Sequence, residues 1–318
     1  MTTLADHPRH GRTAWRRWAG WAVGAAALLL AAYLLRRIYQ TYGWHEIARS
    51  LAEIPAERLA AVAGFVAASY LCLTLVDWLA VRAAGHRLPW RRCALASFTA
   101  LSIGHTVGLA VLSSGAVRYR FYSRWGLGAG DVARIILFCA MTIGLALATL
   151  GGLVLILAPD LATGRLELPS GIVRMIGAAA LAAPAAYLGF AAAGRGRVRV
   201  RRWRIEVPSL PIALGQVAIG PLNLACVSAA LHQALAAGGG LAYLDTLSVY
   251  VVANVTALVS HVPGGLGVLE SVVLALLPET DAIGGVVLFR LAYFLAPFAV
   301  GLLVLTTVEL GRRLHPGR

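Results

Sequence analysis

Apolar residues run along the chain in long blocks that short polar segments separate. Blocks of spanning length predict full transmembrane helices at about 19–35, 59–81, 131–158, 171–193, 210–237 and 282–308. Residues 38–58 mix apolar and charged positions, which indicates a short amphipathic helix at the membrane interface. Two further apolar blocks, 93–115 and 246–278, are not predicted to cross the membrane as single helices.

The block 246–278 is too long for one crossing. Its roughly 33 residues would form a helix of about 50 Å, against a hydrocarbon core of about 30 Å. Pro263, Gly264 and Gly265, followed by Gly267, predict a break between two half-helices inside the membrane. Non-helical backbone inside the membrane is tolerated only where it is buried in protein or lines a water-filled cavity. Transporters bind their substrates at such helix breaks. Polar side chains flank this break: Asn254, Ser260, His261 and Glu270.

The arginine clusters predict a second hairpin. If 93–115 crossed fully, one of the basic segments 82–92 and 118–124 would face outward, against the positive-inside rule. If the chain instead enters at Cys93, turns at Ser113, Ser114 and Gly115, and returns by about Gly128, both segments lie in the cytoplasm. The arginine-rich segment 195–204 and both termini then lie there too.

We therefore expect an all-α polytopic membrane protein with about six full spans and two re-entrant helical hairpins. Residues 1–18 form a cytoplasmic basic N-terminus, 19–310 a single integral membrane domain, and 311–318 a cytoplasmic tail. The halves 19–158 and 171–308 each read span, span, re-entrant hairpin, span, in opposite orientations, which predicts an inverted repeat. A faint echo between Gly108–Ser113 and Gly265–Glu270 agrees with this repeat.

Composition excludes a soluble domain and argues against a nucleic-acid partner. The 318 residues are 59% hydrophobic and 13% charged, with a formal net charge of +14 that comes from arginine without lysine. Because the arginines fall in short loops, they favour membrane topology and anionic lipid. The four cysteines lie singly in apolar segments. Without a P-loop, a GxSxG or an HExxH motif, we expect no enzyme activity, no cofactor and no metal.

Two stretches carry a family resemblance. LSSGAVRYRFY (112–122) and SHVPGGLGVLE (260–270) resemble the signature stretches of the lysylphosphatidylglycerol synthase transmembrane family, the flippase region of the bacterial multiple peptide resistance factor. The resemblance covers about residues 20–310. It implies transport of aminoacylated phosphatidylglycerol or another polar lipid between leaflets of the bacterial inner membrane, in a stand-alone member without the synthase domain. An accessory protein of a lipid, hopanoid or glycolipid pathway is the alternative.

The charged residues inside the apolar blocks have two readings each. Arg118 and Arg120, after the expected turn at Ser113 and Ser114, form a phosphate clamp or serve as interfacial anchors. Glu270 holds a cationic headgroup or pairs with an arginine. Arg134 and Arg290 are the expected partners of the carboxylates of Glu270 or Asp77. The alternative is that these two arginines bind phosphate.

The remaining candidates are polar groups near the breaks or span ends. Asp77 is a helix cap or a site residue, and Asn254 joins helices or binds ligand. His261 carries protons or is a hydrogen-bonded core residue; with Glu270 it also defines a third hypothesis, an intramembrane enzyme. The expected partners are anionic or zwitterionic phospholipids and a separate lipid-modifying enzyme.

Overall fold

The computed structural model describes residues 54–107, 110–160, 163–164, 167–194, 197–200, 203–206, 208–236, 240–260, 262, 265, 267–277 and 282–314. The predicted basic N-terminus, the first span at 19–35 and most of the amphipathic segment 38–58 lie outside these residues, as do His261, Pro263, Gly264 and the last four residues of the tail. The described part belongs to one compact unit, Trp44–Arg318.

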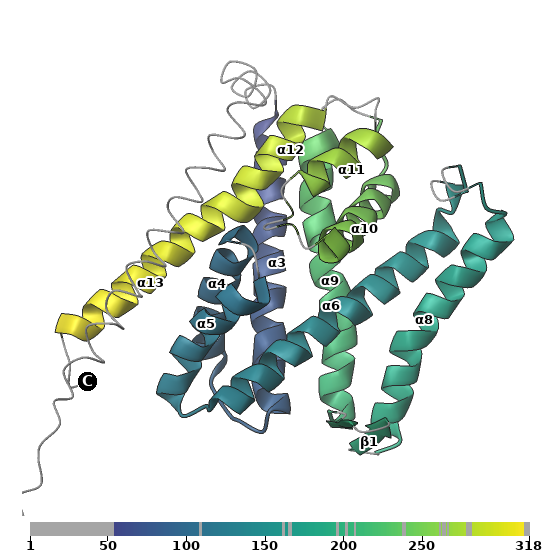
Figure 1. Ribbon diagram of the computed structural model, residues 1–318. Helices are drawn as coiled ribbons and strands as arrows, with labels where there is room; N and C mark the ends of the chain where they lie inside the picture. Colours follow the sequence, from purple (N-terminus) through teal and green to yellow (C-terminus); the bar gives the residue numbers. More distant parts are fainter. Residues whose placement is uncertain are drawn as a thin grey trace, which may run out of the picture. The chain divides into compact units, whose positions relative to one another are not determined.

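Helices make up almost all of this unit (Figure 1). In chain order they are α3 (Ala56–Ala83), α4 (Trp90–Val107), α5 (Ala110–Tyr122), the 3₁₀ turn η1 (Ser123–Trp125), α6 (Ala129–Leu157), α8 (Ser170–Ala192), α9 (Leu210–Leu235), α10 (Tyr243–Ser260), α11 (Val268–Leu276), α12 (Ala282–Arg290), the π-helical turn η4 (Leu291–Leu295) and α13 (Ala296–Leu314). The strands β1 (Arg197–Val200) and β2 (Trp203–Glu206) form an antiparallel hairpin between α8 and α9.

Six helices of the described part are long and apolar enough to cross a membrane, which confirms the prediction of a helical polytopic membrane protein. They comprise α3, α6, α8, α9, α10 and the continuous helix from Gly284 to Leu310 that contains η4. The sequence predicted five of these as full spans and assigned α10 to a broken segment. The segment 195–204, expected as a loop, contains strand β1 and the start of strand β2, which ends at Glu206.

Helices α3 and α9 lie at the centre of the bundle and pack along each other (Figure 1). Around them pack α4, α6, α10 and α12, and the buried apolar core runs through α3, α6, α9, α10 and α12. α8 lies against α6, where Gly152 and Gly177 bring the two backbones together: a Cβ added at either glycine would lie within 2.8 Å of the other's carbonyl oxygen. This close approach is typical of helix packing in membranes.

Two helix pairs interrupt the pattern of long helices. α4 packs against α5, and α10 against α11, so each pair forms a helical hairpin. With 13 and 9 residues, α5 and α11 are about 20 and 14 Å long, which is too short to cross the hydrocarbon core. Gly265 and Gly267, with φ of +56° and +78°, reverse the chain between α10 and α11, as the sequence predicted for this break.

The turn of the first hairpin is not where the sequence placed it. Ser113, Ser114 and Gly115 lie inside α5, which begins at Ala110, whereas α4 ends at Val107. Gly115 serves packing instead, since a Cβ there would lie 3.0 Å from Ile136 Cδ1 of α6. α9 continues through Gly220 and Pro221, in agreement with the full span predicted at 210–237.

Candidate functional site

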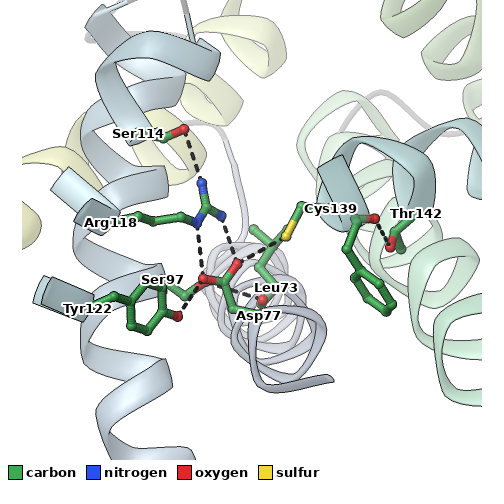
Figure 2. A network of polar contacts seen from close by, with 9 residues as sticks. Leu73, Asp77, Ser97, Ser114, Arg118, Tyr122, Cys139 and Thr142 are labelled. Carbon is green, nitrogen blue, oxygen red and sulfur yellow. Dashed lines mark hydrogen bonds and ion pairs between the residues drawn. The ribbon is translucent and has the colours of Figure 1, made fainter. Parts of the chain in front are cut away.

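The first buried charge pair joins α3 to α5. Asp77 accepts hydrogen bonds from Arg118 Nε at 3.0 Å and Nη2 at 2.7 Å, while Arg118 Nη1 donates to Ser114 Oγ at 3.1 Å (Figure 2). The two charged side chains are only 1% and 3% exposed. A bidentate pair of this kind fixes both the distance and the relative orientation of the two helices.

Two further donors complete the shell of this carboxylate. Tyr122 donates its hydroxyl to Asp77 Oδ2 at 2.9 Å, and Cys139 Sγ of α6 lies 3.3 Å from Oδ1 (Figure 2). Each carboxylate oxygen therefore has two partners, which matches its two lone pairs. Because Asp77 bonds across three helices and lies well inside α3, it is not the helix cap that the sequence suggested.

The second charge pair ties α11 to α12. Arg290 donates to Glu270 through Nε at 2.8 Å and Nη2 at 3.0 Å, as the sequence predicted for one of the carboxylates. Nη2 also donates to the carbonyl of Gly265 at 2.7 Å, so Arg290 reaches the broken backbone itself. The guanidinium lies 4.7 Å from the ring centre of Phe294. Glu270 is more accessible than Asp77, with 17% of its side chain exposed.

The tips of both hairpins meet at the π turn η4. Arg290, which precedes this turn, holds Gly265 at the tip of the α10–α11 hairpin. At the end of α4, Thr106 Oγ1 donates to the carbonyl of Phe294 at 3.4 Å and the His105 ring stacks on Tyr293 at 6.1 Å. A π turn displaces backbone carbonyls from their α-helical partners, and such turns often mark functional positions.

Polar side chains from the central helices surround this turn. The carbonyl of Tyr293 accepts from the hydroxyl of Tyr70, and Ser69 donates to Asn223 Oδ1 at 2.7 Å beside the Tyr293 hydroxyl. The Nδ1 atom of His105 is buried and has no hydrogen-bond partner in the part of the chain that the structure describes. The interior next to the hairpin tips is therefore polar, in a chain that is otherwise apolar.

A third group of charges lies at the other end of the α4–α5 hairpin. The ends of α3, α5 and α13 and the starts of α4 and α6 meet there and form a rim rich in arginine, which we call the basic rim: Arg82, Arg87, Arg91, Arg92, Arg120 and Arg124. Contacts across the rim include His86 with Asp131 at 3.2 Å and Arg92 with the Trp125 ring at 5.7 Å. Arg120 Nη2 pairs with Glu309 of α13 at 2.7 Å.

The structure separates the residues that the sequence grouped together. Arg118 lies in the buried network and Arg120 on the basic rim, although only one residue separates them. Arg134 lies near the start of α6, 64% exposed and 3.6 Å from Asp131, so it pairs with neither Asp77 nor Glu270. Asn254 donates to the hydroxyl of Tyr250 on its own helix at 3.2 Å. His261, Pro263 and Gly264 lie outside the described residues.

Several members of these groups were absent from the sequence-based prediction. Tyr122 lies four residues after Arg118, and Ser114, which the sequence placed at the expected turn, lies four residues before it, so helical periodicity alone would have put all three on one face of α5. Glu309 had a weaker signal, as an isolated acid among the arginines that end the last span. Cys139 and the π turn had none, because their roles depend on contacts across the bundle and on backbone register.

Within the described residues no group of three His, Cys, Asp or Glu side chains gathers as a metal site would require. The site therefore offers hydrogen-bonding and charged groups inside a membrane-spanning bundle. Such an arrangement suits the binding of a polar or charged group in an apolar surrounding.

Comparison with known proteins gives two similar chains of nearly the same length. The chain is 31% identical over 307 residues to the uncharacterized protein slr0712 of Synechocystis sp., covering 94% of this chain and 95% of that protein. It is 27% identical over 319 residues to the inner membrane protein YbhN of Escherichia coli, covering 96% and 95% respectively. No family model matches the chain. On this identity and coverage, the chain belongs to the family of the Synechocystis protein slr0712, and its similarity to an inner membrane protein together with its six apolar helices makes it a multi-pass membrane protein.

Proposed function

We propose that this protein moves a phospholipid or a related polar lipid between the leaflets of the bacterial inner membrane. The observation that carries the proposal is the meeting of two hairpin tips at the π turn, among buried polar groups. Hairpins that end inside the membrane, next to a discontinuous helix, are the usual setting of transporter substrate sites. The chain's resemblance to the lysylphosphatidylglycerol synthase transmembrane family gives the lipid as the substrate class.

The topology in this proposal follows from the two short helices and the basic rim. Since α5 and α11 are too short to cross, we assign α4–α5 and α10–α11 as re-entrant hairpins from opposite sides of the membrane. The positive-inside rule then puts the basic rim in the cytoplasm, together with both termini. The two halves form an inverted repeat in this assignment, as in many secondary transporters.

The interior charges have different roles in the proposed transport. The Asp77 carboxylate is saturated by its partners, so we assign the Asp77–Arg118 pair to holding the first hairpin in place. Glu270 is partly exposed and lies beside the glycine break, so we assign it to the polar path of the lipid headgroup. No nucleotide motif occurs in the sequence, so an ion gradient, a lipid gradient or simple equilibration would drive the movement.

Reconstitution tests this proposal. Purified protein in vesicles should make the inner-leaflet share of fluorescently labelled phosphatidylglycerol accessible to a membrane-impermeant quencher. Glu270→Gln should slow this exposure, while Asp160→Asn, which removes an exposed carboxylate three residues after the end of α6, should not. If labelled phosphatidylglycerol and phosphatidylcholine both stay protected in vesicles that contain the wild-type protein, lipid transport is excluded.

One observation favours a second candidate, a membrane accessory protein without transport of its own. Both interior arginines, Arg118 and Arg290, are engaged with carboxylates of the same chain, as in a structural core. An accessory protein would leave labelled lipid protected in vesicles and would be recovered together with a separate lipid-modifying enzyme when it is extracted from the membrane.

A further inference from the structure

On the basic rim, two arginines pair with the same carboxylate. Glu309 accepts from Arg120 Nη2 through Oε1 at 2.7 Å and from Arg124 Nη2 through Oε2 at 3.1 Å. Arg120 lies at the end of α5, Arg124 in η1, and Glu309 near the end of α13. Two guanidinium groups that converge on two oxygens of one acid present the arrangement by which arginines bind a phosphate.

The three side chains are partly open to their surroundings. Arg120 is 36% exposed, Arg124 21% and Glu309 25%, whereas the Asp77–Arg118 pair is almost fully buried. Ion pairs with this exposure are weak because solvent screens them, so an incoming anion would displace the carboxylate at little cost. The Asp77–Arg118 pair lacks this property, since its four-donor shell closes it to exchange.

The aromatic neighbours place this pair at the depth of lipid headgroups. Arg124 lies over the Phe121 ring at 5.4 Å, and Tyr119 and Trp90, which directly precede the rim arginines Arg120 and Arg91 in the chain, are 48% and 40% exposed. Exposed Tyr and Trp next to arginine are typical of the membrane–water interface, where phospholipid phosphates lie. The surplus of arginine over acid on the rim attracts anionic lipid in particular.

We propose that Arg120 and Arg124 form a binding site for the phosphate of an anionic phospholipid, and that the Glu309 carboxylate occupies this site until the lipid replaces it. In the lipid-bound form the two arginines hold two phosphate oxygens, and the end of α13 is released from α5. The site binds lipid whether or not the chain transports it, so the proposal does not depend on the transport function.

Counting bound lipid on the purified full chain in detergent, by native mass spectrometry, tests the site. Phosphatidylglycerol should bind in preference to phosphatidylcholine. Arg120→Gln and Arg124→Gln should each lower the affinity for phosphatidylglycerol about fivefold, the usual contribution of one basic residue near an anionic membrane. Glu309→Gln should raise this affinity, because it removes the competing carboxylate while leaving both arginines.

Arg87→Gln is the matched control, since it also removes one positive charge from the basic rim, at a residue that is not part of the proposed site. If Arg87→Gln weakens binding as much as Arg120→Gln does, the attraction is general and the proposed site is wrong. Weaker binding in Glu309→Gln would also overturn the proposal, because Glu309 would then support the lipid instead of competing with it. Complete displacement of the lipid by millimolar inorganic phosphate would identify a free-anion site instead of a lipid site.

Discussion

The two charge pairs inside the helical bundle perform the same mechanical task in different surroundings. Each joins the second helix of a hairpin to a neighbouring helix: Asp77–Arg118 joins α5 to α3, and Glu270–Arg290 joins α11 to α12. The first carboxylate is 1% exposed and the second 17%. A fully buried pair resists change because either charge is costly without its partner, whereas a partly solvated pair tolerates rearrangement. The first hairpin is therefore the more firmly fixed of the two.

The charges also sit on opposite partners in the two pairs. The arginine belongs to the hairpin in the first pair, and the carboxylate belongs to the hairpin in the second. The sequence echo that suggested an inverted repeat aligns Ser113 with Glu270, so it does not relate the pairs to each other. The arrangement of one pair therefore cannot be derived from the other by the proposed repeat, which agrees with different roles for the two hairpins.

The largest effect is expected at the first pair. Asp77→Asn leaves the Arg118 charge buried without its carboxylate, so it should lower the free energy of unfolding by about 3–5 kcal/mol. Thermal unfolding of the detergent-solubilised protein measures this loss. Adding Arg118→Gln to Asp77→Asn should recover part of it, because no uncompensated charge then remains. An unchanged unfolding temperature in Asp77→Asn would show that the pair does not hold the hairpin.

Sequence reasoning located the helices well because hydrophobic length is a strong signal. The span predicted at 59–81 is α3 at Ala56–Ala83, and that at 131–158 is α6 at Ala129–Leu157. The turn predicted at Ser113–Gly115 was wrong, because serine and glycine also occur inside membrane helices where neighbours approach closely. Backbone freedom and close packing favour the same residue types, so composition alone does not separate them.

The sequence predicted only part of the candidate site, because it shows that a charge needs a partner but not which residue the fold brings to it. A buried carboxylate needs a partner, which led to the pairing of Glu270 with Arg290. That argument does not say which partner, so it missed the pairing of Asp77 with Arg118, 41 residues away. The sequence could not predict the π turn at Leu291–Leu295, since carbonyls of this turn accept hydrogen bonds from Tyr70 and Thr106 on other helices.

A smaller effect is expected at the second pair. Glu270→Gln should cost about 1–3 kcal/mol, because Arg290 keeps the Gly265 carbonyl and the Phe294 ring and the carboxylate is partly solvated. Thermal unfolding compared with Asp77→Asn gives the difference directly. The double variant with Arg290→Gln should restore part of the loss. A cost as large as that of Asp77→Asn would remove the distinction between a fixed hairpin and an adaptable one.

The smallest effect is expected on the basic rim, where Arg118 and Arg120 give a comparison within one helix. Arg120→Gln removes one arginine from a partly exposed carboxylate that also pairs with Arg124, so the free energy of unfolding should change by less than about 1 kcal/mol. Raising the salt concentration should reduce even this difference, since ions screen exposed charges but hardly reach buried ones. Arg118→Gln, two residues earlier, should destabilise strongly at any salt concentration, because it leaves Asp77 buried without its cation. If the two variants unfold alike, burial does not separate these arginines, and the rim pair is as structural as the interior pair.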